Sequence, residues 1–506
     1  MDQKPYVEIK NNSLSIEIDE IPVLKYDKFY DQVVGFLKDE AKHCIAYYAL
    51  VSSDKLKFYC CIADDNNSSI AIFAHELKND QRRIKSITPI CPQMHIFERE
   101  IHENSEVDFE GHPWLKPVRY PHYRTDKSKI MDNYPFYNIE SEELHEVGVG
   151  PVHAGVIEPG HFRFICNGEK VLHLEIQLGY QHRGIEELFI TKNTPLQRCV
   201  LSESIAGDSS VGHALAHSQL IESLSGMEAD EKLQVERCIA LELEKLAVNI
   251  GDTAALCGDV AYQLGQVACE ALRTTIINTT QLWCGNRFGK GLIRPGGTNC
   301  PLDNDIADEI LKILGNSGKR FSKIADRIYS LPSVLSRFDD IGILTKQQGL
   351  AIGIVGQAAR SSGIQRDVRH THPFQYYKKY SSKPIILETG DVLARGLLRV
   401  LEAGESVKII QELIKIWREK TGDIRMPVYN YILRPDRFAI SMVEGWRGEI
   451  CHLAATDKNG YINHYKVKDP SIHNWMALAL AVRNQEISDF PICNKSFNLS
   501  YCGHDL

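Results

Sequence analysis

Residues 148–189 read GVGPVHAGVIEPGHFRFICNGEKVLHLEIQLGYQHRGIEELF, and this stretch determines how the rest of the chain is interpreted. Asn167-Gly168 separates two runs, 161–165 and 171–177, in which apolar and polar residues alternate. Asn-Gly readily adopts the positive φ angles of a tight hairpin turn. The pattern therefore predicts a β-hairpin preceded by a Gly- and Pro-rich loop.

Histidines and an acid surround this predicted hairpin. His153 and His161 bracket a turn that contains Glu158, and Arg183 follows the second strand. Imidazoles and a carboxylate at the edge of a cavity can have their pKa values tuned by charge and burial. We therefore take Glu158, His161, His153 and Arg183 as candidate catalytic residues. The spacing alone fits polar residues on a surface loop equally well.

Several motifs together indicate a family. The run GPVH, EPGHFRF and GYQHRGIE within 150–186 resembles the start of the large subunit of group 4, complex I-related NiFe hydrogenases. It is also similar to the quinone-pocket, 49 kDa-type subunit of respiratory complex I. Glu98-Arg99-Glu100 followed by FEGHP at 109–113 resembles the signature of the small hydrophilic, 30 kDa-type subunit of complex I. Segments 353–374, 444–449 and 467–475 match the large subunit again.

The resemblance implies an α+β fold made of two fused subunits. Residues 1–120 are expected to form a small α/β domain, with a helix over 28–42 and a meander of strands over 44–51, 56–63 and 70–75. Residues 121–146 are polar and irregular and are interpreted as a linker. Residues 147–506 are expected to form a mainly helical domain like the NiFe hydrogenase large subunit, with the hairpin at its N-terminal end.

Two helical predictions come from apolar spacing. Residues 231–251 carry an apolar stripe, and Glu236, Arg237, Glu244 and Lys245 are expected on the opposite, solvent-facing side. Asp391 is expected to cap a helix that ends near residue 403, followed by a second helix over 405–420.

Composition excludes several classes of protein. The formal net charge of −8 argues against a nucleic-acid-binding surface. The sequence has no apolar run of about 20 residues, the length that a membrane span needs. Fourteen cysteines without a regular spacing predict buried thiols in a reducing, cytoplasmic compartment. Association with the inner face of a membrane is then expected through partner subunits.

The resemblance also locates where metal ligands would lie. NiFe hydrogenases of this family hold the metals with two Cys-x-x-Cys pairs, which align here with Ala206 and Ser209 and with Ser500 and Gly503. None of these residues is a thiol, so we expect no metal bound by this chain. Three nearby cysteines are out of register and are interpreted as structural thiols: Cys199, Cys493 and Cys502.

The complex I relative implies a different chemistry, in which a His and a Tyr donate to a quinone headgroup. The His aligns with His161, whereas the Tyr position falls near Gly207. Glu158 aligns with the proton-relay acid of the family. Quinone binding remains open, and Tyr180 or Tyr501 could replace the missing phenol in space.

Three hypotheses follow for function. In the first, the chain is an oxidoreductase-complex subunit that couples NADH:quinone or hydrogenase-like electron transfer to ion translocation. Its partners would be an iron-sulfur small subunit, a ferredoxin-like subunit and polytopic antiporter-like membrane subunits, with the iron-sulfur clusters in those partners. In the second, the chain is a cofactor-free structural or conformational-coupling subunit. In the third, it oxidises hydrogen or reduces quinone with unfamiliar ligands, which the replaced cysteines disfavour.

Overall fold

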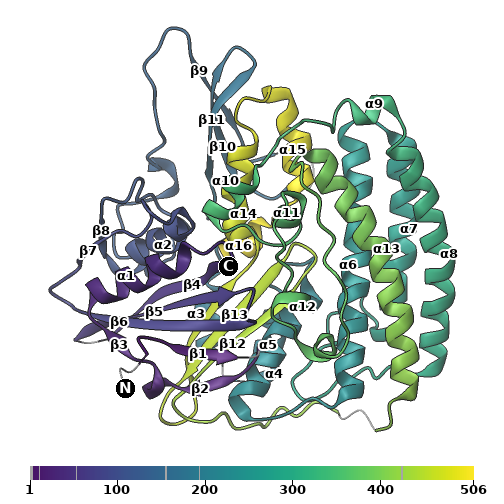
Figure 1. Ribbon diagram of the computed structural model, residues 1–506, viewed down its shortest axis with the longest axis horizontal. Coiled ribbons are helices and arrows are strands. Elements are labelled where there is room, and N and C mark those ends of the chain that lie inside the picture. Colours follow the sequence, from purple (N-terminus) through teal and green to yellow (C-terminus); the bar gives the residue numbers. More distant parts are fainter. Residues whose placement is uncertain (1–3, 11, 53, 154–156, 193, 423–425) are drawn as a thin grey trace.

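The computed structural model describes residues 4–10, 12–52, 54–153, 157–192, 194–422 and 426–506. Sheets at one end of the molecule and a bundle of long helices at the other give an α+β architecture, as the sequence predicted (Figure 1). No helix in these described ranges is both long and apolar enough to cross a membrane.

The N-terminal part is built on a five-stranded sheet. Its central strands form the expected antiparallel meander, in which β5 pairs with both β4 and β6. Helices α1 and α2 cover one face, where their apolar side chains join those of the sheet in one core. The elements are β1 (Val7–Lys10), β3 (Val23–Leu24), α1 (Tyr26–Leu37), β4 (Lys42–Val51), β5 (Lys55–Asp64), β6 (Ser69–Lys78), β7 (Arg83–Lys85), α2 (His95–Ser105) and β8 (Asp108–Glu110).

The other face of this sheet packs on a second sheet, from the C-terminal part. That sheet has the order β14 (Ile462–Lys468), β13 (Glu449–Thr456), β12 (Arg437–Glu444) and β2 (Ser15–Glu17). The ring of Tyr59 on β5 stacks on Phe438 of β12 with centroids 5.4 Å apart. Because β2 comes from the N-terminal part and pairs with β12, the two parts share a sheet as well as a core.

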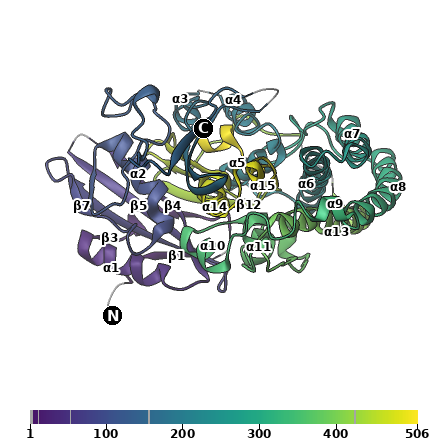
Figure 2. The same ribbon diagram turned by 90° about the horizontal axis from the view of Figure 1, so that it is seen from above.

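Four long helices form the bundle, at the far end from the N-terminal sheet (Figure 2). They are α6 (Glu231–Asp259), α7 (Gln263–Cys284), α8 (Asn304–Ile328) and α13 (Val392–Glu419). Asp391 caps α13 as predicted, because its side chain accepts from the amide of Ala394 at 2.8 Å. The prediction of two helices here was wrong: α13 continues through Gly404, because one glycine costs only about 1 kcal/mol in a helix.

The polar side of α6 is also unlike the prediction. Glu236, Arg237 and Lys245 are buried rather than solvent-facing, and Glu244 is only partly accessible. Arg237 pairs with Glu222 at 2.6 Å. Periodicity separates apolar from charged residues, but it does not show that a charged side of a helix faces other charged groups inside the protein.

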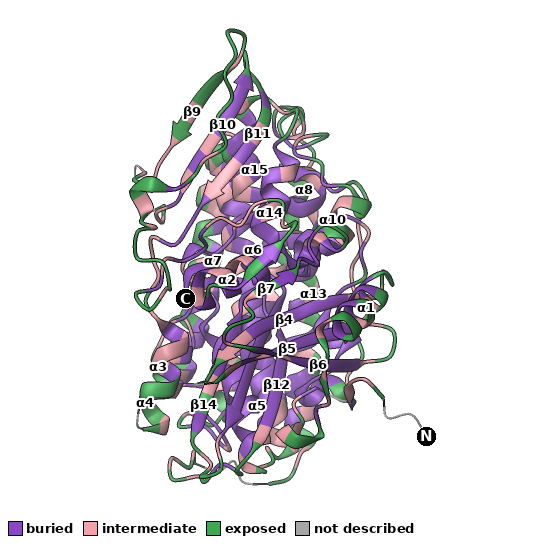
Figure 3. Cartoon of the chain, turned by 90° about the vertical axis from the view of Figure 1, so that its left-hand side faces the viewer, coloured by how far each residue is buried: buried purple, intermediate pink, exposed green. Residues whose placement is uncertain are grey.

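The predicted hairpin is present, with one more strand beside it. β10 (His161–Asn167) and β11 (Lys170–Gln177) are joined by the Asn-Gly turn, and β9 (His145–Val149) pairs with β10. This sheet projects from the body of the molecule, and its outer end is exposed (Figure 3). The expected linker, residues 121–146, is irregular apart from a short 3-10 helix and the first residues of β9.

The remaining helices connect these units. They are α3 (Ile185–Thr191), α4 (Pro195–Ser202), α5 (Ser210–Ser225), α9 (Pro332–Leu335), α10 (Lys346–Ile352), α11 (Gly356–Ser361), α12 (Val368–Thr371), α14 (Ser471–Ala481), α15 (Phe490–Phe497) and α16 (Tyr501–Asp505). α5 is almost entirely buried, between the β12–β14 sheet and the long helices.

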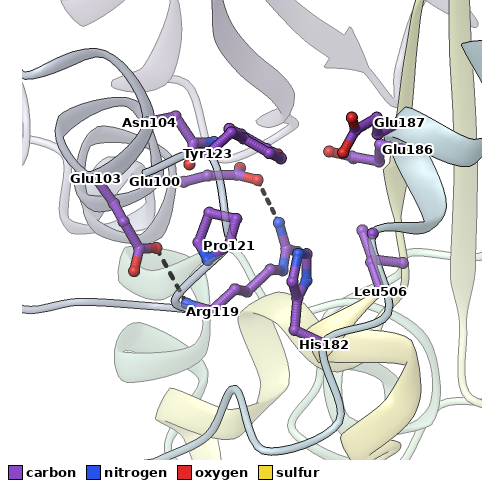
Figure 4. Close-up of a pocket in the computed structure, with 11 residues that line it drawn as sticks. Glu100, Glu103, Asn104, Arg119, Pro121, Tyr123, His182, Glu186, Glu187 and Leu506 are labelled. Atoms are coloured by element: carbon purple, nitrogen blue, oxygen red, sulfur yellow. Dashed lines mark hydrogen bonds and ion pairs between the residues drawn. The ribbon is translucent and has the colours of Figure 1, made fainter. Parts of the chain in front are cut away.

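Buried charges hold the two parts together. Glu100 on α2 pairs with Arg119 (Figure 4). It also pairs with Lys466 on β14 at 2.5 Å. Lys466 in turn lies 3.1 Å from Glu186 on α3. Burial acts to raise the pKa of Glu100, but the charges of Arg119 and Lys466 outweigh it and lower the pKa to about 2. The junction therefore depends on an ionised, buried carboxylate.

We predict that Glu100→Gln destabilises the chain by about 3–5 kcal/mol near pH 7, because it leaves two buried cations without this carboxylate. The pKa of Glu100 is depressed from 4.5 to about 2 in the folded chain, so its contribution is present above about pH 4.5 and is lost toward about pH 2. The difference between wild type and variant should shrink over that window. Urea unfolding near pH 7 and near pH 3 measures it.

Glu17→Gln is the matched control, because Glu17 pairs with Arg437 across the same junction at 2.9 Å but its side chain is 57% exposed. It should cost less than about 1 kcal/mol at either pH. Equal effects of the two substitutions would contradict the assignment of the buried pair as the main ionic link.

Candidate functional site

His153 and His161 close the loop between β9 and β10. His153 Nε2 lies 2.9 Å from the carbonyl of Gly160, and His161 Nδ1 lies 3.0 Å from the carbonyl of Gly150. Each imidazole is thus bonded to a main-chain group at the other end of the loop. Residues 154–156, between the two histidines, lie outside the described residues. The contacts show two histidines that hold the loop in shape.

Arg183 joins two segments that are distant in the sequence. Its guanidinium donates to the carbonyls of Ser204 and Ile205, at 2.6 and 2.8 Å, and to the carbonyl of Cys502 at 3.1 Å. Its own amide donates to the carbonyl of Leu506 at 2.7 Å. Arg183 therefore holds together the two segments that contain the residues aligned with the family cysteines.

Glu158 faces the same C-terminal segment. Burial raises the pKa of Cys502 to about 11, and the negative charge of Glu158 raises it further while Arg183 acts in the opposite direction. Burial also raises the pKa of Tyr501 to about 12, again with a contribution from Glu158. Of the four predicted residues, Glu158 and Arg183 thus meet around Cys502, whereas the histidines bond within their own loop.

The four residues that the sequence aligned with the family cysteines lie on these two segments. Ser500 Oγ accepts from the amide of Gly503 at 2.9 Å and so caps α16. Ser209 Oγ lies 3.4 Å from both Asp208 Oδ1 and an Arg447 nitrogen. Ala206 is buried and apolar.

The space at position 503 is already filled. A Cβ built on Gly503 would lie 2.7 Å from Cγ of Asp469 and 2.9 Å from Oγ of Ser500. Any side chain there would require Asp469 to move. The pair Asp208 and Arg447 lies beside this region, with two ion-pair contacts of 2.7 and 2.6 Å.

A cavity of about 680 Å³ lies at the junction of the two parts of the chain. Its lining is mainly apolar and aromatic, including Trp114, Ile176 and Trp475, and its polar groups include Arg99, Glu175 and His504. This size and lining suit a small organic ligand. None of the four predicted catalytic residues lines it, so the sequence located the loop cluster but not this cavity.

Sequence reasoning missed several residues that shape the region. Asp469 and Arg447 lie within segments 467–475 and 444–449, for which the sequence indicated only a match to the large subunit. Cys502 was interpreted as a structural thiol, yet Glu158 and Arg183 both lie near it. The available signal was Arg447 between Trp446 and Gly448. An arginine that is buried in such a segment requires a carboxylate partner, here Asp208.

Comparison with known proteins identifies the family of both parts. Residues 25–125 match the family described as respiratory-chain NADH dehydrogenase, 30 Kd subunit, and residues 259–437 match its 49 Kd subunit. Formate hydrogenlyase subunit 5 of Escherichia coli (strain K12) is 25% identical, over 97% of this chain and 88% of the relative. The carbon monoxide-induced hydrogenase of Rhodospirillum rubrum is 29% identical, over 70% of this chain and 97% of the relative.

A solved structure shares the fold. A chain of the membrane-bound sulfane sulfur reductase, an archaeal respiratory membrane complex, superposes with a TM-score of 0.67 at 20% identity. The match covers 73% of this chain and all of that chain. This likeness shows the fold. The two matched family models show that this chain belongs to the hydrophilic subunits of the complex I family, with 30 and 49 kDa-type subunits fused in one polypeptide and with complex I-related hydrogenases among its relatives.

Proposed function

We propose that this chain is the fused hydrophilic subunit of a membrane-associated redox complex that couples electron transfer to ion translocation, and that it builds no NiFe centre of its own. The proposal rests on the identity of the four residues that align with the family cysteines. They hold Ala206, Ser209, Ser500 and Gly503 in a fold that is otherwise retained.

The residues present do not fit a NiFe centre. Nickel and iron in this family are held by soft thiolate ligands, and the four positions offer only two hydroxyls, both of which have hydrogen-bond partners. The carboxylate of Asp469 occupies the space beside Gly503 where a thiolate would lie. Cys502 is the thiol nearest to this position in sequence, and its pKa, raised to about 11, opposes the deprotonation that ligation requires.

The partners follow from the family. We assign iron-sulfur clusters to a hydrogenase- or complex I-type small subunit and to a ferredoxin-like subunit. Polytopic antiporter-like subunits would provide the membrane part and hold this chain at the cytoplasmic, inner face of the membrane. A quinone would fit the size and the apolar lining of the cavity of about 680 Å³, with Arg99 and His504 as its polar contacts.

A second function is favoured by a specific observation. His153, His161 and Arg183 all bond to main-chain carbonyls rather than pointing freely into a cavity. Such contacts suit a cofactor-free subunit that transmits conformational change between its partners. Metal content and the effect of Glu158 on activity distinguish this role from a redox role.

We predict substoichiometric nickel in the intact complex, purified through a non-metal-binding tag on this chain and without nickel resin. Iron and sulfide should be present, because the partner subunits would carry the clusters. Elemental analysis by mass spectrometry measures all three, with a mock purification from untagged cells as the control. Nickel near one atom per chain would overturn the ligand argument and support a hydrogenase with unusual coordination.

We predict that Glu158→Gln lowers the pKa of the Cys502 thiol below about 11, because a negative neighbour is removed. A decrease of about one unit would raise the thiolate fraction about tenfold below the pKa. The rate of Cys502 alkylation against pH, followed by peptide mass spectrometry, measures the change. Glu187→Gln, on α3 and outside the Cys502 contacts, should leave the rate unchanged.

The same variant tests the redox role. Glu158→Gln, and independently His161→Ala, should impair electron transfer by the complex while the complex still assembles. Wild-type activity in both variants, with the thiol shift present for Glu158→Gln, would favour the cofactor-free coupling role.

A further inference from the structure

A continuous row of hydrogen-bonded side chains runs through the core between α5 and the β12–β14 sheet. Asp469 Oδ2 lies 3.2 Å from Nε2 of His213, whose Nδ1 lies 3.0 Å from Nε2 of His452. His452 Nδ1 lies 2.8 Å from the Tyr465 hydroxyl, which lies 2.9 Å from Nδ1 of His217. All five side chains are buried.

Three elements align these groups. His213 and His217 stand one turn apart on α5, so they lie on the same side of the helix. His452 on β13 and Tyr465 on β14 are diagonal neighbours, since His452 pairs with Val467. Asp469 follows β14 directly. Strand period and helix period thus place five polar groups in one line.

At the Asp469 end of the row, the donor and the acceptor of the hydrogen bond can be assigned. Asp469 Oδ1 accepts from the amide of Ser471 at 2.8 Å, so Oδ2 is the atom left to accept from His213. Its charge state supports this: burial acts to raise the pKa of Asp469, but the hydrogen bonds from His213 and Ser471 and the charge of Arg447 act to lower it. The carboxylate is an acceptor, which makes His213 Nε2 a donor.

Every other hydrogen bond then follows. With neutral imidazoles, His213 Nδ1 accepts from His452 Nε2, His452 Nδ1 accepts from the Tyr465 hydroxyl, and Tyr465 accepts from His217 Nδ1. The last atom, His217 Nε2, is a buried acceptor with no partner among the described residues. The four hydrogen bonds of the row therefore all donate in the same direction. They run from His217, whose Nε2 is unpaired, toward Asp469.

The surroundings of His217 keep that residue neutral. Burial, followed by the charges of Arg198 and Arg294, lowers the pKa of His217 to about 3. Phe189 of α3 lies against its ring, with centroids 5.3 Å apart. Arg198 belongs to α4, whose outer side is exposed (Figure 3). His217 is thus the end of the row toward α3 and α4.

Two further titratable groups lie near Asp469. Arg447 contributes to lowering the pKa of Asp469, but it is itself paired with Asp208. Glu244 of α6 accepts from the amides at the start of α5, at 2.7 and 3.0 Å, and burial raises its pKa to about 8. Burial lowers the pKa of His452, the next histidine in the row. Of the three histidines in the row, His213 is the one in contact with a carboxylate, the partner that an imidazolium requires inside a protein.

We propose that Asp469, His213, His452, Tyr465 and His217 form a proton-conducting wire, which takes up a proton at His217 Nε2 and holds it as an imidazolium–carboxylate pair of His213 and Asp469. This function goes beyond the proposed role of the chain and does not depend on it.

The proton count balances along the row. A proton binds His217 Nε2, and the proton on its Nδ1 passes to the Tyr465 oxygen. The Tyr465 proton passes to His452 Nδ1, and the proton on His452 Nε2 passes to His213 Nδ1. The row gains one proton in total, all of it on His213, while His217, Tyr465 and His452 stay neutral. Each of the three has exchanged one proton for another.

This transfer has a distinctive signature, because His217 changes tautomer without changing charge. In the unloaded state its proton is on Nδ1, and in the loaded state it is on Nε2. Imidazole ¹⁵N NMR of the ¹⁵N-histidine-labelled full chain reports both tautomer and charge. As the pH falls, the switch of His217 should share its midpoint with the protonation of His213. Protonation of His213 with His217 still carrying its proton on Nδ1 would overturn the proposal.

Asp469→Asn tests the same coupling without a titration. The Asn oxygen is needed to accept from Ser471, which turns the amide nitrogen, a donor, toward His213. Every hydrogen bond in the row then reverses, and His217 should carry its proton on Nε2 at all pH values. An unchanged His217 tautomer in this variant would also overturn the proposal.

Tyr465→Phe interrupts the row at its centre while keeping the ring. The tautomer of His217 should then cease to follow His213. Tyr47→Phe is the matched control, because Tyr47 is a buried tyrosine bonded at 3.2 Å to His75 in the N-terminal sheet, outside the row. It should leave the coupled switch intact. Histidine signals are assigned by single His→Gln substitutions.

Discussion

The centre of this protein depends on the hydrogen bonds of one buried carboxylate, that of Asp505. Its two oxygens accept from the amides of Gly179 and Gln181, at 2.8 and 2.9 Å, and from His504 Nδ1 at 2.9 Å. These bonds fix α16 against the loop that leaves β11. Arg119 of the N-terminal part then donates to the carbonyl of His504 at 2.7 Å. The hairpin, the N-terminal part and the segment with the family cysteine positions therefore meet at one short helix.

Buried and paired charges like these occur elsewhere in the core. Arg360, for example, is fully buried and contacts both Glu402 and Glu444, at 2.6 and 2.7 Å. Removing one partner from a set of this kind leaves an uncompensated charge, which costs far more than the pair itself contributes. The core is thus tolerant of exchange among apolar residues but not of the loss of single charges.

The sequence predicted those parts of the fold that local chemistry determines. Asn167-Gly168 permits only a tight turn between two alternating runs, and the side chain of Asp391 satisfies a free amide at the start of a helix. The polar side of α6 was misjudged because its partners, such as Glu222, come from other elements. Charge alone does not show whether a residue faces water or an opposite charge.

The same limit applies to the site. Motifs marked the loop with Glu158 and the neighbourhood of Arg183, because those residues stand close together in the sequence. The row from His217 to Asp469 could not be recognised in this way, since its members come from a helix, two strands and the turn after them. A single histidine on a buried helix usually makes one hydrogen bond within the core. Only the folded chain shows that each bond here is followed by another.

One residue links the positions that the sequence aligned with the family cysteines to the buried polar core. Asp469 fills the space beside Gly503, and it is also the fixed acceptor that orients the row of histidines. A side chain at 503 would place its Cβ 2.7 Å from Cγ of Asp469, so this carboxylate would have to move from its position beside His213. A larger residue at 503 and the present position of Asp469 therefore exclude each other. Gly503 and the row of histidines depend on the same carboxylate, so the two form one structural unit.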